Sequence, residues 1–438
     1  MSVVDDEKTD GKKNDGKKSW MIDTSPLRMT TFRRMWIGTG ASFFGFQFTA
    51  VAVPVQMFAI THSTFWVGLL GVAGLVPLLI FGLWGGAVAD VVDRRRLLLT
   101  SSALTWVVTL GLLVQAILGV RSPHLLLVLT AVQAIGFAIS SPARQSIVPR
   151  IVPTEMVPAA NTLNYTTTTA GGVLGPLAAG LIMGIWSTGS GVAVAYLVDA
   201  LLFTLTFWAT WRLPPIPPIE PDETGEKPTA GLRGIVVGLK FLVTQPVLLL
   251  SFAVDLIAMV FAMPRALFPA VAEERFGGPT AVGWLFSAIA IGSLLGGLTS
   301  GWISRVRRQG IALIVAVVGW GVAIALSGLA HQLWLAVLLL AVAGAADLVS
   351  AVYRQTIMQT FAPDRLRGRL QGVFTVVVAG GPRLGDLRAG ATAQFTGVGV
   401  SWVGGGLVAA GLTVMLALAF PALLRYRPVP EPAANAER

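Results

Sequence analysis

The stretch Gly381-Pro382-Arg383-Leu384-Gly385-Asp386-Leu387-Arg388-Ala389-Gly390 lies inside an apolar segment that is long enough to span a bilayer. Its charges are costly there, because a charge at the bilayer centre costs between about 3 and about 15 kcal/mol. Such residues usually face a protein interior or a watery cavity and find partners. A second stretch, Gly171-Gly172-Val173-Leu174-Gly175-Pro176-Leu177-Ala178-Ala179-Gly180, has the same glycine spacing 210 residues earlier but carries no charge. The chain is therefore interpreted around this pair of stretches.

Composition indicates a polytopic membrane protein. The chain has 438 residues, of which 54% are hydrophobic and only 12% are charged, whereas soluble domains carry about 25% charged residues. The sequence has no cysteine and only three dispersed histidines, which argues against a thiol-ligated or His-ligated metal. No cofactor is expected. The net charge of +10 is assigned to cytoplasmic loops, which collect Lys and Arg, and not to nucleic-acid binding.

The apolar runs predict an all-α protein with twelve transmembrane helices, because each span needs about 20 apolar residues. The expected spans are residues 33–60, 65–89, 97–120, 124–146, 158–186, 190–211, 245–272, 280–303, 310–330, 333–356, 369–396 and 400–425.

The basic residues predict the orientation. A cytoplasmic N-terminus places nearly all of the 32 Lys and Arg residues in cytoplasmic segments, and leaves only Arg121 and Arg275 in outer loops. By the positive-inside rule, both termini are expected in the cytoplasm.

The chain divides into two similar halves. Arg144-Gln145-Ser146-Ile147 matches Arg354-Gln355-Thr356-Ile357 at the same offset of 210 residues as the glycine stretches. The Pro-rich and acidic segment between the halves predicts a cytoplasmic linker. The expected parts are a disordered tail (1–30), a six-helix bundle (31–211), the linker (212–240), a second six-helix bundle (241–426) and a C-terminal tail (427–438). Parallel six-helix repeats around a central pathway are typical of one large class of transporters.

A glycine-rich and charged loop follows the second span: Gly85-Gly86-Ala87-Val88-Ala89-Asp90-Val91-Val92-Asp93-Arg94-Arg95-Arg96. It resembles the signature of the major facilitator superfamily at Gly86, Asp90, Arg94, Arg95 and Arg96. The resemblance implies that Asp90 locks the two halves together on the cytoplasmic side. Its expected partner is Arg367 or Arg369, at the start of the eleventh span.

The fifth span resembles the antiporter signature of the same superfamily, and this implies export. The matching residues are Gly171, Gly175, Pro176 and Gly180. A closer resemblance to the enterobactin exporter subfamily covers nearly the whole chain, for example at Val51-Ala52-Val53-Pro54-Val55-Gln56 and at Leu267-Phe268-Pro269-Ala270. The charged eleventh span looks more like the actinobacterial multidrug efflux branch.

Buried polar residues are candidates for the transport pathway. Gln47, Gln133, Asp255 and Asp347 each lie in the middle of a different predicted span, and the resemblance implies that these four spans line the cavity. Hydrogen bonding between helices, worth about 0.6 kcal/mol per bond, is the alternative. For the two carboxylates a function is favoured, because a buried carboxylate must pair or bind a proton. For Asp199 a structural role is favoured.

The remaining charged candidates lie in the seventh and eleventh spans. Arg383 and Asp386 are three residues apart and are expected to pair locally. Arg388 points elsewhere, and Asp347 is its expected partner. Arg265 is interpreted either as a contact for an anionic substrate group or as half of a structural pair.

These features predict a non-enzymatic secondary exporter in the bacterial inner membrane. No phosphate loop or nucleophile–base set is evident, so export is expected to use an ion gradient, most simply by proton antiport. Asp347 is slightly favoured over Asp255 as the proton site. The expected substrate is a small amphipathic or aromatic compound, either a siderophore or a drug, and the protein is expected to be a monomer. The alternatives are a lysophospholipid flippase and a non-transporting membrane scaffold.

Overall fold

The computed structural model describes residues 23–186, 188–214, 216, 232–363 and 366–426. Within these ranges, side chains are described except at residues 83–91, 142–143, 145–146, 188, 232–235 and 367–368. Residues 1–22 of the predicted tail (1–30), the predicted tail 427–438 and most of the predicted linker lie outside the described residues. The rest of the first predicted tail is not disordered, because it includes a short 3₁₀ helix, η1 (Ser25–Arg28).

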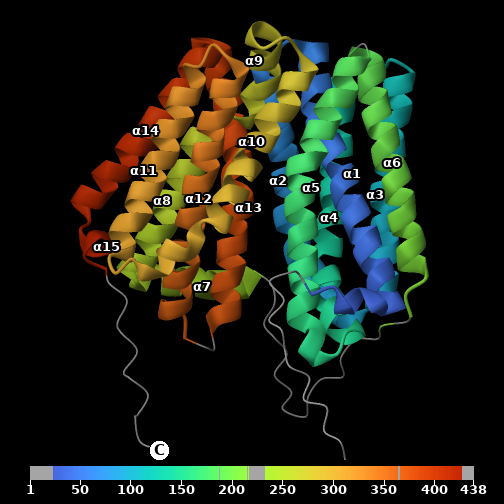
Figure 1. Cartoon of the computed structure of the whole chain (residues 1–438), viewed down its shortest axis with the longest axis horizontal. Coiled ribbons are helices and arrows are strands. Elements are labelled where there is room, and N and C mark those ends of the chain that lie inside the picture. The colour runs from blue at the N-terminus through green and yellow to red at the C-terminus, as the bar shows by residue number, and fades with distance from the viewer. Residues whose placement is uncertain (1–22, 187, 215, 217–231, 364–365, 427–438) are drawn as a thin grey trace, which may run out of the picture.

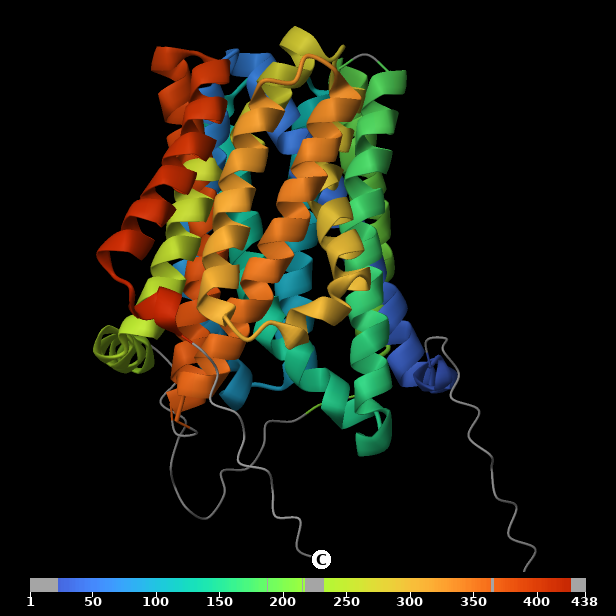
Figure 2. The same ribbon diagram turned by 60° about the vertical axis from the view of Figure 1, so that its left-hand side comes forward.

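The described chain is helical and forms two bundles that stand side by side (Figures 1 and 2). The first bundle contains α1 (Thr30–Thr61), α2 (Thr64–Val91), α3 (Arg94–Ile117), α4 (Pro123–Ile151), α5 (Val157–Ile185) and α6 (Thr188–Trp211). The second contains α8 (Pro246–Ala262), α9 (Phe268–Arg275), α10 (Pro279–Leu298), α11 (Gln309–Gly328), α12 (Leu333–Phe361), α13 (Arg367–Thr396), α14 (Val398–Ala419) and the short α15 (Ala422–Arg425). The predicted fold class is confirmed.

Eleven helical segments of the described chain are long and apolar enough to cross a membrane. The one predicted span that is missing from these eleven is the eleventh, 369–396, which corresponds to α13 (30 residues). Its apolar character is weaker because Arg383, Asp386 and Arg388 interrupt it. Because of these charges, α13 is not recognised as a membrane span from its apolar composition alone.

The seventh predicted span, 245–272, is broken. α8 ends at Ala262, a short 3₁₀ helix, η3 (Arg265–Leu267), follows, and α9 then begins at Phe268. Pro264 lies at this break, and proline both lacks a backbone N–H and clashes with the preceding helical turn. The break therefore has a direct cause in the sequence.

A short helix, α7 (Leu232–Thr244), occupies part of the region predicted as linker. It lies across the lower end of the second bundle in Figure 1, and not parallel to the spanning helices. Gly238 and Leu242 are buried, whereas Val236, Leu239 and Val243 are exposed. The apolar periodicity of a helix is present in the sequence, but this segment is too short to span a bilayer.

The two bundles meet through close contacts of α2 with α13 and of α5 with α10. A Cβ atom added at Gly180 of α5 would lie 2.7 Å from the Cα atom of Gly283 of α10. A Cβ atom at Gly68 of α2 would lie 2.7 Å from the carbonyl oxygen of Asp386 of α13. Gly180 is near the end of α5 and Gly68 is near the start of α2. These ends of the two helices lie at the same end of the bundles as α9, at the top of Figure 1 and opposite α7. The bundles are therefore closed against each other at the α9 end.

The predicted gate residues Gly86, Asp90 and Arg367 lie outside the described side chains. The neighbouring Asp93 has a clear local role. Its carboxylate accepts the backbone N–H of Arg96 at 3.0 Å, which caps α3, and the backbone N–H of Ile216 at 2.9 Å. Asp93 therefore fixes the chain that leaves α6 against the start of α3.

Candidate functional site

A cavity of about 450 Å³ lies between the two bundles. Its wall comes from α1, α2, α4, η3 and α13, with one residue each from α5 and α10. The volume is within the range of pockets that bind small molecules, about 300–1,000 Å³. The cavity combines apolar and aromatic side chains with a few polar ones. The polar and aromatic members are Gln47, Thr49, Thr130, Gln133, Arg265, Arg383, Asp386, Phe46, Phe137 and Phe286.

Five predicted pathway residues line this cavity, namely Gln47, Gln133, Arg265, Arg383 and Asp386. The tight contact between α5 and α1 helps to place Gln47, because a Cβ atom at Gly175 would lie 2.5 Å from the Gln47 Cβ atom. The other predicted pathway residues, Asp255, Asp347 and Arg388, do not line the cavity.

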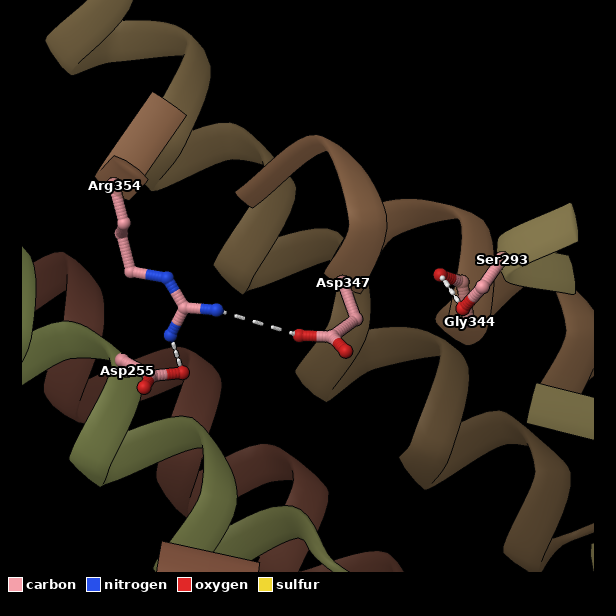
Figure 3. Close-up of polar contacts among 5 residues, drawn as sticks. All are labelled: Asp255, Ser293, Gly344, Asp347 and Arg354. Carbon is pink, nitrogen blue, oxygen red and sulfur yellow. Dashed lines mark hydrogen bonds and ion pairs between the residues drawn. The ribbon is translucent and has the colours of Figure 1, made fainter. Parts of the chain in front are cut away.

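Asp255 and Asp347 belong to a charged group inside the second bundle, centred on Arg354 of α12 (Figure 3). Arg354 Nη1 pairs with Asp255 Oδ1 of α8, and Arg354 Nη2 lies 3.8 Å from Asp347 Oδ1. The Asp255 side chain is 4% exposed, whereas that of Asp347 is 32% exposed. Asp255 is therefore held by a buried ion pair, and Asp347 is the more accessible partner of the same guanidinium.

Arg354 was missed as a site residue in the sequence. In the sequence it stands out only as part of the repeat that matches Arg144. The repeat is the signal that could have revealed it, since Arg144 also lies inside its bundle, where its Nη1 donates to Ser42 Oγ at 3.2 Å. In both halves an arginine at the same repeat position forms a polar contact with another helix.

The predicted pairing of Arg388 with Asp347 is wrong in this structure. Arg388 donates instead to backbone carbonyl oxygens of α8 and α14. The reason is the break after α8, which leaves carbonyl groups without helical partners close to the guanidinium.

Arg383 and Asp386 are near enough to interact electrostatically, but no ion pair between them is found within 4.0 Å in the described part of the chain. Arg383 Nη1 donates to the Ala379 carbonyl oxygen at 2.8 Å, and Asp386 Oδ1 accepts the Ala266 N–H at 3.2 Å. The expected local pair is thus replaced by a backbone contact for each side chain.

Asp199 of α6 is 1% exposed. Its Oδ2 accepts a hydrogen bond of 2.5 Å from the hydroxyl of Thr49 on α1. A Cβ atom at Gly45 would lie 2.6 Å from Asp199 Oδ1, so the carboxyl group packs tightly against α1. This arrangement agrees with the structural role that was favoured for Asp199.

Comparison with known proteins identifies the family. A family model described as "Transmembrane secretion effector" matches residues 22–435. The chain belongs to this transmembrane secretion effector family of the major facilitator superfamily.

Relatives of this protein include enterobactin exporters. The enterobactin exporter EntS of Shigella boydii serotype 18 is 31% identical over 424 residues, which cover 94% of this chain and 98% of that protein. EntS of Escherichia coli O81 is 30% identical with the same coverage. The predicted resemblance is confirmed, and the chain is a multi-pass efflux transporter of the inner membrane.

Solved transporter structures share the fold of this chain at low sequence identity. The nucleoside transporter NupG superposes with a TM-score of 0.72 at 16% identity, covering 91% of this chain and 100% of that chain. A bacterial homologue of the human lysosomal transporter Spinster, solved in an inward-facing and unoccupied conformation, superposes with a TM-score of 0.70 at 18% identity, covering 93% and 100%. These likenesses support the two-bundle architecture.

The glycines of the predicted antiporter motif in α5 lie where this helix contacts its neighbours. Gly171 faces Phe43 of α1, Gly180 faces Gly283 of α10, and Pro176 lines the cavity. Small residues let helix backbones approach closely in membranes. The motif therefore joins α5 to α1 in its own bundle and to α10 in the other bundle.

Proposed function

We propose that this transporter exports a small anionic aromatic compound of the catecholate siderophore class by proton antiport. The observation that carries the proposal is the chemistry of the cavity wall. Arg265 and Arg383 both line the cavity with one carboxylate, Asp386, so the charged lining has an excess of positive charge. Phenylalanines from both bundles, Phe137 and Phe286, complete an amphipathic lining.

Arg265 is the residue that best suits an anionic group. Its Nε atom is buried and has no hydrogen-bond acceptor in the described part of the chain. A buried donor without a partner costs about 1–3 kcal/mol, and an anionic substrate oxygen would relieve that cost. The guanidinium presents five donors in a planar arrangement that matches an anion with two adjacent oxygens. The relatives named as enterobactin exporters support the same substrate class.

Proton coupling is supported by the group around Arg354. Asp347 is partly exposed, lies 3.8 Å from Arg354, and is also within electrostatic reach of Arg265 on the cavity wall. An anion bound at Arg265 would weaken the influence of this positive charge on Asp347. A carboxylate whose basic neighbours change during transport suits the binding and release of a proton. Asp347 is therefore favoured over Asp255, whose partner is fixed and buried.

The proposal is tested by transport in proteoliposomes with an imposed pH gradient. Enterobactin is expected to accumulate against its gradient, whereas ethidium, an aromatic cation, is expected to be a poor substrate. Arg265→Gln is expected to raise the KM for enterobactin by about tenfold, since a hydrogen bond to a charged group is worth about 1.5–3 kcal/mol. Arg275→Gln is the control, because Arg275 donates to the Gly328 carbonyl oxygen and does not line the cavity.

Gradient-driven ethidium transport without enterobactin transport would overturn the substrate class. An unchanged KM in the Arg265→Gln variant would remove Arg265 from substrate binding. Transport of enterobactin that is insensitive to the pH gradient would overturn proton antiport.

A further inference from the structure

The break in the seventh span leaves backbone groups without helical partners on both of its sides. The last carbonyl groups of an α-helix and the first N–H groups of the following one have no partners within their own helices. At this break they lie near Ala262, where α8 ends, and near Arg265, where η3 begins. Such groups are expensive to leave unpaired in a membrane protein, because lipid supplies no hydrogen bonds.

Arg388 satisfies the side of the break that belongs to α8. Its Nε donates to the Val260 carbonyl oxygen at 3.2 Å, and its Nη2 donates to the Phe261 carbonyl oxygen. Its Nη1 donates to the Ser401 carbonyl oxygen of α14 at 3.2 Å. A cation at this position also complements the negative end of the α8 dipole.

Asp386 satisfies the other side of the break. Its Oδ1 accepts the backbone N–H of Ala266, in the first turn of η3, at 3.2 Å. Asp386 and Arg388 are two residues apart on α13, so one short segment of one helix holds both sides of the break. A carboxylate is placed at free N–H groups and a guanidinium at free carbonyl groups, which is the favourable sign for each.

Two glycines provide the space for this arrangement. A Cβ atom at Gly405 of α14 would lie 2.6 Å from Arg388 Nη2. A Cβ atom at Gly385 of α13 would lie 2.7 Å from the Met263 Cβ atom and would also meet the Met259 carbonyl oxygen. Larger residues at either position would push Arg388 or the broken segment away. The contacts at the break thus depend on the charges of Asp386 and Arg388 and on the space that Gly385 and Gly405 leave for them.

We propose that Asp386 and Arg388 form a clamp that positions Arg265 and the outer segment of the seventh span, η3 and α9. Arg265 and Ala266 line the cavity next to Asp386, whereas Arg388 lies behind them at the carbonyl groups of α8. The clamp residues are positioning residues, because the bonds that they make are to the backbone around Arg265.

The clamp also determines how the outer segment moves. α13 packs against α2 of the first bundle, where a Cβ atom at Gly68 would lie 2.7 Å from the Asp386 carbonyl oxygen and one at Gly71 would lie 3.2 Å from the Asp386 Cβ atom. When the bundles separate at the α9 end, α13 leaves α2. Because the clamp ties η3 to α13, Arg265 then stays beside Asp386 in the second bundle. The cavity is therefore expected to keep Arg265 beside Asp386 when the bundles separate.

The test measures the reactivity of a buried thiol, and it needs no knowledge of the substrate. The chain contains no cysteine, so Leu267→Cys gives a single thiol in η3, at a position that is 0% exposed and does not line the cavity. With the full-length protein in proteoliposomes, N-ethylmaleimide is expected to react slowly with this thiol. Arg388→Met or Asp386→Leu in the same background is expected to raise the rate about tenfold, because a charged hydrogen bond to the segment is lost.

Conservative variants and a second thiol separate positioning from general loss of structure. Asp386→Asn keeps an oxygen that accepts the Ala266 N–H, so its reaction rate is expected to stay near that of the parent. Arg275→Met removes another arginine–carbonyl contact of α9, remote from the break, and is also expected to leave the rate unchanged. Ala281→Cys, 2% exposed on α10, should react slowly in every variant.

The clamp is rejected if both Arg388→Met and Asp386→Leu leave the reactivity at position 267 unchanged. It is also rejected if the thiol at position 281 becomes reactive to the same extent, since the substitutions would then loosen the whole bundle. An equal increase with Arg275→Met would show that any lost contact of the outer segment has this effect, and would likewise contradict the assignment.

Discussion

Arg354 of α12 forms an ion pair with Asp255 of α8, and each of these side chains is only 4% exposed. The two residues come from different helices of the second bundle and carry opposite charges in a region where an isolated charge is expensive. Arg354 also has a second carboxylate, Asp347, at 3.8 Å. The guanidinium therefore compensates more than one acid, and its loss should affect the protein more than the loss of either acid.

Substitution of one member of this pair should destabilise the protein. Arg354→Met is expected to cost about 3–5 kcal/mol, because it leaves a buried carboxylate without compensation. Asp255→Leu should cost less, since Arg354 keeps Asp347 nearby. The double variant Asp255→Leu/Arg354→Met should recover much of the lost stability. Thermal unfolding of the purified variants in detergent measures this order, and equal losses in the two single variants would contradict it.

Asp347 and Asp255 should differ in energy coupling. Asp347→Asn is expected to abolish accumulation of substrate driven by a pH gradient while leaving downhill exchange intact, because exchange needs no proton. Asp255→Asn should lower stability but retain coupling. Both are measured as uptake and counterflow in proteoliposomes. If both Asn variants accumulate substrate as well as the parent does, neither carboxylate is the proton site.

The closed α9 end of the bundles should open during transport. An added Cβ atom at Gly184 of α5 would lie 3.3 Å from the Thr280 Cβ atom of α10, and disulfide-bonded residues have Cβ atoms about 3.5–4.5 Å apart. The pair Gly184→Cys/Thr280→Cys is therefore expected to cross-link on oxidation and to block transport until it is reduced.

The control for this experiment is a cross-link within one bundle. A Cβ atom at Gly296 of α10 would lie 3.2 Å from the Ala345 Cβ atom of α12, so the pair Gly296→Cys/Ala345→Cys should also oxidise. Transport should continue in this control, because the two helices belong to the same bundle. Full transport with the Gly184–Thr280 cross-link formed would show that this contact does not separate.

The orientation predicted from charge is tested by labelling single thiols in intact cells. Gly189 and Gly301 each have open space around the position of an added Cβ atom. Gly189 lies at the start of α6 and Gly301 in a short 3₁₀ helix (Ser300–Arg305) after α10, and the charge distribution places these two positions on opposite sides. Gly189→Cys is expected to react with an impermeant maleimide from outside, whereas Gly301→Cys should react only after permeabilisation. The reverse pattern would invert the predicted topology.

The sequence was sufficient to predict the helices and the two-bundle architecture. Apolar runs predicted α1 to within three residues at its beginning and one at its end, because the thickness of a bilayer sets the length of a span. The offset of 210 residues between the glycine stretches predicted the two halves. The sequence also indicated which residues line the cavity, since five of its polar candidates are found there.

Partners of the buried charges were decided only by the tertiary structure. Asp255 and Arg354 are far apart in the chain, so their contact depends on how α8 packs against α12 and not on any spacing along one helix. Arg388 was assigned to Asp347 because charges were expected to pair with charges. Its actual partners are carbonyl groups at the break after α8, and the number of free carbonyl groups at a helix end becomes known only when the end itself is known. The periodicity of a helix predicts which face a side chain takes, whereas the partner on that face is set by the neighbouring helix.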